Sequence, residues 1–402
     1  MQLDGVSLKS LARKHGTPLY VYSAKTIRER YRRLVRAVSW RDSLVCYALK
    51  ANSNRAVCAL LADEGAGADI VSGGELIRAG RAGFHPSKIV FSGVGKTRDE
   101  MAAALRRKIL AFHVESGEEL AALESVAKRL KTRAPFSIRV NPGVKADTHH
   151  HITTGTVENK FGVEAPEAAA LYERALRSRW LAPVGVQCHL GSQIVDPAPY
   201  GKALDHLLGL VDRIEGKGAN LRYLDIGGGM GIPYASGKTM NLERFAGTLT
   251  RRLVGRPLTL VIEPGRWLVG PAGVLLTEVL YRKKTTARRF VVVDAGMNDL
   301  LRPALYGAAH TIAAVTPRRG RRVRFDLVGP VCETADRFVH GLEMVEPEPG
   351  DLLAIGEAGA YGFSMSSTYN SRPRPAELLV DGGRARLIRR RERLDDLVRD
   401  ER

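Results

Sequence analysis

Apolar and polar positions follow two different rhythms along this chain. From about residue 43 to residue 270, short apolar runs of strand length alternate with longer amphipathic runs of helical spacing. Strand, helix and strand in this order are typical of parallel pairing with right-handed crossovers. The predicted strands are 44–49, 69–71, 89–92, 109–114, 136–140, 185–189, 223–226 and 258–263. Eight strands in roughly 230 residues favour a (β/α)8 barrel, a TIM barrel, over an open sheet.

The rhythm changes after residue 270, where strand-like runs follow one another without long helices between them. This pattern predicts a second, antiparallel β-barrel or sandwich domain. A strand at 18–22 precedes the barrel and is expected to join that domain. The predicted domains are therefore a barrel over 25–270 and a β-domain built from 1–24 and 271–402. The predicted strands of the β-domain are 274–281, 289–294, 311–314, 323–327, 352–355 and 376–380, and the predicted barrel helices are 54–64, 73–82, 97–107, 117–130, 166–178 and 200–215.

Composition places the chain among ordinary globular proteins, with 402 residues, 44% of them hydrophobic and 26% charged. No apolar run approaches the ~20 residues that span a bilayer, and no signal peptide is visible, so we expect a cytoplasmic protein without membrane contact. The four cysteines lie far apart without metal-ligand spacing, which indicates free thiols.

The net charge of +19 raises the question of a nucleic-acid partner. The basic residues are spread along the chain, and the densest clusters are 318–322 and 389–391. Aromatic residues make up only 6% of the chain and do not interleave with these clusters, so stacking platforms for bases are absent. An arginine-rich solvated surface is the favoured interpretation, and no nucleic-acid partner is predicted.

Lys50 directly follows the apolar strand 44–49, at the end of a barrel strand where function is usually found. A buried ammonium is costly, so this lysine either reaches solvent or has a lowered pKa and becomes a reactive amine. Reactive amines of this kind bond to carbonyl compounds, above all pyridoxal phosphate.

Other predicted strand ends add polar chemistry. The glycines 227–229 allow backbone N–H groups to approach an anion, although the spacing does not fit a dinucleotide fingerprint. Glu263 and Arg266 flank a Pro-Gly turn; they form either a surface ion pair or a site in which the carboxylate faces a ring nitrogen. His189 is either a structural residue or a ring that stacks on a flat cofactor, with Ser192 donating to its phosphate.

Two further sets of residues carry side chains that can bind metal or react. The histidines 149–151 are adjacent and do not converge on one tetrahedral site, so we predict no metal. Cys332 and Glu333 place a thiol and a carboxylate in a tight turn of the β-domain, where a buried cysteine beside a surface glutamate is the simpler alternative. Polar-aromatic loops of the β-domain add Arg302, Tyr306 and Tyr361.

Together these motifs resemble the diaminopimelate decarboxylases, which belong to the alanine-racemase-like (fold-type III) decarboxylases that depend on pyridoxal phosphate (PLP). The resemblance extends over nearly the whole chain, with independent motifs in the same order. Those motifs are 17–22, 47–52, 69–76, 158–162, 189–193, 225–231, 263–266 and 388–392.

The resemblance implies a role for each candidate residue. Lys50 would hold PLP, His189 would stack on its ring, and Glu263 would pair with its ring nitrogen. The phosphate would be bound by Ser192, by Gly227, Gly228 and Gly229 and by the backbone of Gly265 and Arg266, with help from Tyr361. The distal end of the substrate, meso-diaminopimelate, would be bound by Arg266, Arg302, Tyr306 and Glu333, with Tyr361 nearby; Cys332 would supply a proton after CO2 leaves.

The resemblance also implies a homodimer, in which the loop of Cys332 and Glu333 reaches the active site of the other subunit. Trp267 and the stretch 307–309 depart from the family pattern. The resemblance therefore does not define which residues form the edge of the substrate pocket. The competing hypotheses are a decarboxylase of the same fold that acts on ornithine, arginine or a carboxylated polyamine, and a PLP-binding protein without catalysis.

Overall fold

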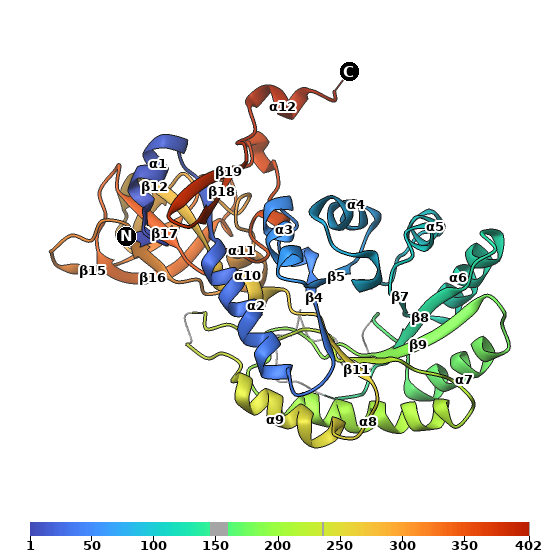
Figure 1. Cartoon of the computed structure of the whole chain (residues 1–402). Coiled ribbons are helices and arrows are strands. Elements are labelled where there is room, and N and C mark those ends of the chain that lie inside the picture. Colours follow the sequence, from blue (N-terminus) through green and yellow to red (C-terminus); the bar gives the residue numbers. More distant parts are fainter. Residues whose placement is uncertain (145–159, 235–236, 402) are drawn as a thin grey trace. The chain divides into compact units, whose positions relative to one another are not determined.

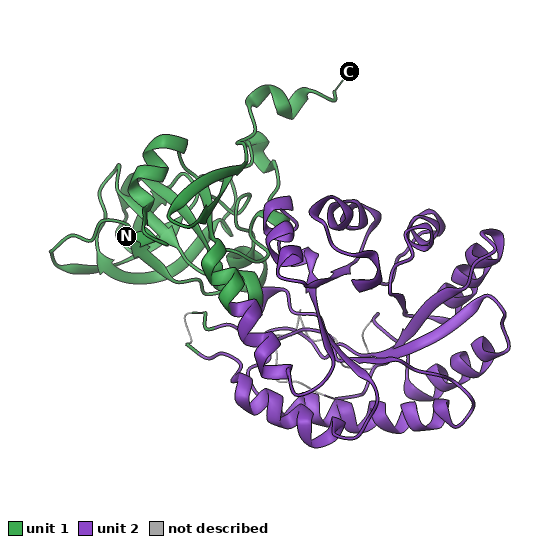
Figure 2. Cartoon of the chain, viewed as in Figure 1, with its two compact units in different colours: residues 1–29, 233–237, 268–402 green, residues 30–232, 238–267 purple. Residues whose placement is uncertain are grey.

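The computed structural model describes residues 1–144, 160–234 and 237–401. The chain forms two compact units (Figure 2). Unit 1 comprises Met1–Glu29, Pro233–Gly237 and Leu268–Arg402, and unit 2 comprises Arg30–Ile232 and Lys238–Trp267. The histidines 149–151 and residues 158 and 159 lie outside the described residues, so the prediction that these histidines bind no metal stays a prediction.

Unit 2 is a closed barrel of eight strands, and all of its strand pairs are parallel (Figure 1). Each predicted barrel strand is present, within a few residues of its expected bounds. Around the barrel the strands follow the order β10-β11-β4-β5-β6-β7-β8-β9, and β9 pairs with β10 to close the ring. Their bounds are β4 Ser43–Ala48, β5 Gly67–Ile70, β6 Ile89–Phe91, β7 Ala111–Val114, β8 Ala134–Arg139, β9 Leu181–Gln187, β10 Tyr223–Asp225 and β11 Thr259–Ile262.

Helices connect these strands, and their polar caps explain where several of them begin. The hydroxyl of Ser72 accepts from the backbone N–H of Glu75 at the start of α4, and Thr97 and Glu100 form a capping box on α5. The six predicted barrel helices are all present, and α2 and α9 add to them. The helix bounds are α2 Ala24–Val38, α3 Arg55–Asp63, α4 Gly73–Ala82, α5 Arg98–Arg106, α6 Gly117–Arg129, α7 Ala165–Leu176, α8 Ala198–Glu215 and α9 Leu242–Leu253.

Unit 1 contains a nine-stranded sheet, in which β3 pairs with β12 and β18. The predicted early strand therefore does join the second domain. The sheet is mixed rather than wholly antiparallel as predicted, because β3–β18 and β13–β15 are parallel pairs. The strand bounds are β3 Leu19–Ser23, β12 Gly273–Lys284, β13 Arg289–Val293, β14 Ile312–Ala314, β15 Arg322–Val328, β16 Arg337–Val345, β17 Leu352–Ile355, β18 Ala376–Asp381 and β19 Arg384–Arg389.

The core of unit 1 lies between this sheet and the helix α1 (Leu8–His15). Leu8 and Leu11 of α1 pack in one buried cluster with apolar residues of β3, β12 and β18. Burial of this apolar surface is the main force that holds the N-terminal segment to the sheet. The remaining short elements of the unit are β1 Gln2–Leu3, β2 Val6–Ser7, α10 Arg266–Val269 (which begins in unit 2), α11 Arg302–Tyr306 and α12 Leu394–Val398.

In the described part of the chain, no helix is both long enough and apolar enough to cross a bilayer.

Candidate active site

Lys50 lies in a short 3-10 turn that directly follows β4. Its Nζ is 2.8 Å from Oδ2 of Asp69, which is fully buried at the end region of β5. The Lys50 side chain keeps 37% of its surface exposed, so the amine is held by a carboxylate on one side and remains accessible on the other. The structure therefore places an oriented, reachable amine at the C-terminal end of a barrel strand.

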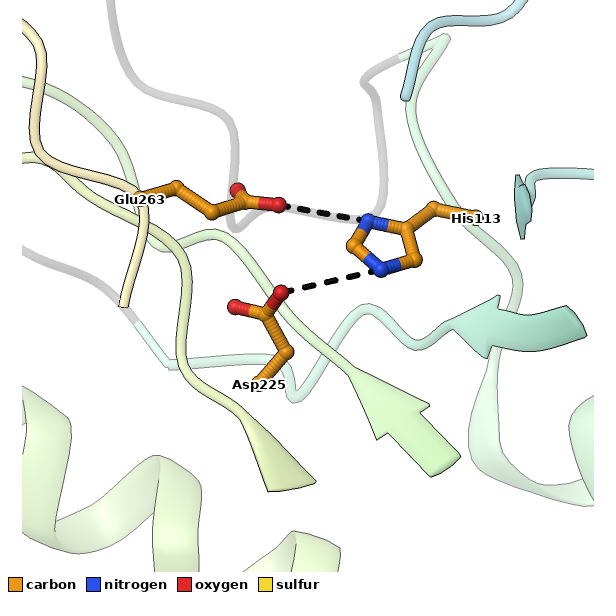
Figure 3. A group of neighbouring side chains, drawn as sticks. All are labelled: His113, Asp225 and Glu263. Carbon is orange, nitrogen blue, oxygen red and sulfur yellow. Dashed lines mark ion pairs between the residues drawn. The ribbon is translucent and has the colours of Figure 1, made fainter. Parts of the chain in front are cut away.

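Glu263 follows β11 and is almost completely buried. Its Oε1 is 3.2 Å from Nδ1 of His113 (Figure 3). Its Oε2 accepts from Nε2 of Gln187 at 3.3 Å. Burial raises the pKa of this carboxyl, but the hydrogen bond from His113 and the charge of Lys50 bring the pKa down to about 2. Glu263 is therefore ionised at neutral pH inside a closed environment.

Asp225, the last residue of β10, has the opposite protonation behaviour. Its Oδ1 accepts from the backbone N–H of Gly227 at 2.7 Å, and its Oδ2 lies 3.6 Å from Nε2 of His113. Complete burial and the negative charge of Glu263 raise the pKa of Asp225 well above its usual range. The negative charge of this carboxylate pair consequently resides on Glu263.

His189 presents a neutral ring beside the turn that follows β10. This turn consists of Gly227, Gly228 and Gly229 and is called the glycine turn below. Its Nδ1 accepts from the backbone N–H of Gly228 at 3.2 Å, so the proton of the neutral ring is on Nε2. Desolvation and the positive charges of Arg139 and Lys50 lower the pKa of His189 to about 3. A flat, uncharged imidazole suits stacking on an aromatic ring.

The glycine turn has no room for side chains. A Cβ on Gly227 would lie 2.6 Å from Nδ1 of His189, a Cβ on Gly228 would collide with the carbonyl of Glu263, and one on Gly229 with the carbonyl of Gly191. The turn therefore brings bare backbone to the ends of β9, β10 and β11, as an anion cradle requires.

Ser192 and Arg266 meet on the same side of the barrel. The guanidinium of Arg266 donates to Oγ of Ser192 at 3.0 Å, and Arg266 is buried. Gly265 packs so tightly that an added Cβ would lie 3.0 Å from Cβ of Ala51. Trp267, the departure from the family pattern, is buried with the guanidinium of Arg30 4.0 Å from its ring centre, so it fills space behind the turn.

The other predicted residues belong to unit 1. Arg302 begins α11 and is buried, with its Nη1 3.0 Å from Nε2 of His310 and its guanidinium carbon 4.8 Å from the ring centre of Tyr234. Tyr306 ends the same short helix and is half-buried. Gly307 terminates the helix with a φ of 61°, which explains a glycine at this point of the 307–309 stretch.

Cys332 and Glu333 lie in an exposed turn before β16, so the alternative of a buried cysteine is wrong. The backbone N–H of Cys332 donates to Oδ1 of Asn370 at 2.9 Å, and the hydroxyl of Tyr369 donates to the carboxylate of Glu333. Tyr361 is half-buried with a φ of 56°, a left-handed conformation that is uncommon outside glycine. The three remaining cysteines, Cys46, Cys58 and Cys188, are buried, and burial raises the pKa of each thiol.

Sequence reasoning missed His113 and Glu115; the carboxylate of Glu115 is 3.3 Å from the guanidinium of Arg139. His113 lies inside the predicted strand 109–114, whereas the candidate residues of the barrel were those at or after strand ends. The available signal was a titratable residue inside an otherwise apolar barrel strand.

The donor set of unit 2 fits PLP. A reachable amine is suited to its carbonyl group, a neutral imidazole to its ring, and an ionised buried carboxylate to a protonated ring nitrogen. The glycine turn and the hydroxyl of Ser192 are suited to its phosphate. Fold and site together define a PLP-dependent enzyme built on a (β/α)8 barrel.

Comparisons with known proteins agree with this class. Residues 24–270 match the family model described as pyridoxal-dependent decarboxylase, pyridoxal binding domain. The diaminopimelate decarboxylase of Pseudomonas aeruginosa is 51% identical over 398 residues, which are 99% of this chain and 96% of that protein. The chain belongs to the diaminopimelate decarboxylase family.

Solved structures extend the likeness to three dimensions. The crystal structure of diaminopimelate decarboxylase from Helicobacter pylori complexed with L-lysine has a TM-score of 0.95 and 45% identity, covering 97% of this chain and 98% of that one. The lysine/ornithine decarboxylase from Vibrio vulnificus, complexed with putrescine, has a TM-score of 0.82 at 21% identity and covers 93% of this chain and 97% of that one. This second likeness shows a shared fold alone.

Proposed function

We propose that this chain decarboxylates meso-diaminopimelate to L-lysine and CO2, the last step of lysine biosynthesis, with PLP as its cofactor. The observation that carries the proposal is the similarity to diaminopimelate decarboxylases over nearly the full length of both chains. The chemistry that bound PLP supplies is a sink for the electron pair left at the α-carbon when CO2 departs.

The barrel residues hold and polarise the cofactor. Lys50 anchors it through the amine that Asp69 orients at 2.8 Å. Glu263 keeps the ring nitrogen protonated, because its buried, ionised carboxylate is a charge-assisted acceptor. His189 covers one face of the ring. The phosphate would be bound by Ser192, by Gly227, Gly228 and Gly229 and by the backbone of Gly265 and Arg266, with Tyr361 from the β-domain.

The β-domain residues recognise the substrate and deliver a proton. Arg302, Tyr306 and Arg266 bind the distal carboxylate, Glu333 binds the distal ammonium, and Tyr361 contributes nearby. Cys332 protonates the α-carbon after CO2 leaves, a role supported by the exposure of its thiol in a chain whose other three thiols are buried.

The assembly that we propose is a homodimer with shared active sites, in the cytoplasm. The barrel domain of residues 25–270 binds PLP, and the β-domain of residues 1–24 and 271–402 supplies substrate and dimer-interface residues. The exposed turn of Cys332 and Glu333 supports this arrangement, because a reactive loop on the outside of one chain is available to a partner.

The decisive experiment measures CO2 release from meso-diaminopimelate, ornithine and arginine by the PLP-loaded protein under identical conditions. We expect kcat/KM for meso-diaminopimelate to exceed the others at least ~100-fold, because a site that pairs a distal carboxylate loses those bonds with a simple amine. Lys50→Ala is the control: it should abolish turnover and the visible absorbance of bound PLP. Faster release from ornithine would contradict the proposed substrate, and binding of PLP without any CO2 release would favour the non-catalytic alternative.

A further inference from the structure

His113 is a fully buried histidine to which neither the family resemblance nor the proposed function assigns a role. It lies on β7, and its ring stands between two acidic residues from other strands, Asp225 and Glu263 (Figure 3). Nδ1 is 3.2 Å from Oε1 of Glu263, and Nε2 is 3.6 Å from Oδ2 of Asp225. The ring therefore links the ends of three barrel strands at the carboxylate expected to face the cofactor.

The contacts of Nδ1 determine which ring nitrogen carries a proton. An ionised carboxylate can only accept hydrogen bonds, so the short contact to Glu263 requires a proton on Nδ1. Oγ of Ser92 is also 3.1 Å from Nδ1 and 3.5 Å from Oε1 of the same carboxylate, which encloses that oxygen. On the other side of the ring, the hydroxyl of Tyr223 lies 3.4 Å from Nε2.

The same three residues have the composition of a metal site, since their ligand atoms lie within 4.8 Å of one another. The geometry argues against that use. The two carboxylates face opposite nitrogens of one imidazole, and a single ion cannot bind both nitrogens of the same ring. These distances agree better with an imidazole ring that contacts one carboxyl group through each nitrogen than with a ring that coordinates a cation.

We propose that His113 is a positioning residue for the proposed PLP chemistry, whose Nδ1–H orients the Glu263 carboxylate toward the cofactor ring nitrogen and keeps it ionised. The inference rests on the proposed function, because it assumes that Glu263 faces this nitrogen. His113 touches neither cofactor nor substrate in this role; it acts through Glu263. The lowered pKa of Glu263, to which the hydrogen bond from His113 contributes, supports it.

The experiment uses three substitutions with different donor positions. His113→Asn places an amide N–H near the position of Nδ1, His113→Gln places one near the position of Nε2, and His113→Leu removes both. Each variant is loaded with PLP labelled with ¹⁵N in the ring, and the ring-nitrogen chemical shift is followed against pH together with the PLP dissociation constant. Tyr172→Phe is the matched control, since it removes a buried barrel hydroxyl that donates to the carbonyl of Gly185 at 2.6 Å.

We expect His113→Leu and His113→Gln to lower the ring-nitrogen pKa by about one unit or more and to weaken PLP binding roughly tenfold, the effect of one charge-assisted hydrogen bond. His113→Asn should remain within about threefold of wild type in PLP affinity, and Tyr172→Phe should lose thermal stability without moving the ring-nitrogen pKa.

A ring-nitrogen titration in His113→Leu that matches wild type would overturn the inference, as would an Asn variant that behaves like the Leu variant. If His113→Leu does not fold, the comparison of Asn with Gln decides the question. None of these readouts requires turnover. A wild-type protein that binds PLP but releases no CO2 would therefore refute the proposed function while the titration still decides the role of His113.

Discussion

Asp225 and Glu263 are two buried carboxyl groups that respond oppositely to the same environment. The pKa of Glu263 is lowered to about 2, whereas the pKa of Asp225 is raised well above its usual range by burial and by the charge on Glu263. In the unfolded chain Asp225 ionises near pH 4, so above that pH the protein must take up a proton at Asp225 to fold. Asp225 therefore costs stability, and the cost grows as pH rises from its unfolded pKa toward its folded pKa.

Asp225→Asn removes this cost and keeps an oxygen for the backbone N–H of Gly227. Relative to wild type, the free energy of unfolding of this variant should increase as pH rises above about pH 5, by up to about 1.4 kcal/mol for each pH unit, so the variant becomes the more stable protein. Urea unfolding at several pH values measures the difference, with Asp63→Asn as a control that removes an exposed carboxylate. A stability difference that is the same at pH 5 and pH 7 would show that Asp225 is ionised in the folded protein.

Residues at strand ends could be predicted from sequence, and residues within strands could not. Lys50 and Glu263 follow apolar runs, so the barrel rule alone directs attention to them. His113 lies inside such a run, and its importance depends on β10 and β11, more than 100 residues away, which bring Asp225 and Glu263 to its ring. Only the closed topology of the barrel brings Asp225 and Glu263 next to the ring of His113.

At the scale of elements, the hydrophobic pattern predicted all eight barrel strands but missed four strands of unit 1, namely the two-residue strands β1 and β2 and the longer strands β16 and β19. β16 and β19 lie at the ends of the sheet path, and β19 is exposed over most of its arginine-rich length. An edge strand that buries little apolar surface leaves no period-two pattern to detect. The parallel pairs of the same sheet were also missed, because pairing direction depends on distant partners such as β3 and β18.

The glycine turn after β10 allows a test of how closely the ends of β10 and β11 pack. In Gly228→Ala the new methyl group would collide with the carbonyl of Glu263, so the ends of β10 and β11 would be forced apart. We expect a loss of about 1–3 kcal/mol in the free energy of unfolding, as in other overpacked sites, with weaker PLP binding because Glu263 moves. Urea unfolding and PLP titration measure the two effects.

Gly209→Ala is the matched control for that substitution. Gly209 is exposed within α8 of the same unit, and a Cβ there would meet no atom within 4 Å. This variant should gain about 0.5–1 kcal/mol, because alanine is the better helix former. Equal effects of the two substitutions would mean that the turn has room for a side chain after all.

At the scale of the whole molecule, the candidate site residues divide between the two units, with Lys50 in the barrel unit and Cys332 in the β-domain unit. If the Cys332 loop completes the active site of a partner subunit, as we propose, a dimer of two differently inactivated chains must regain one complete site. Lys50→Ala leaves an intact Cys332 loop, and Cys332→Ala leaves an intact PLP anchor. Neither variant alone should retain more than about 1% of wild-type turnover, given the roles of both groups in the reaction.

Mixing the two variants under conditions that exchange subunits should restore about one quarter of wild-type turnover, because half of the dimers are mixed and each mixed dimer has one complete site. CO2 release is measured before and after exchange, with each variant exchanged against itself as the control. Recovery should follow the formation of mixed dimers, which tags of different mass on the two chains make countable. Mixed dimers that form without regaining turnover would place Cys332 and Lys50 of the same chain in one site, and a protein that remains monomeric would remove the dimer from the proposal.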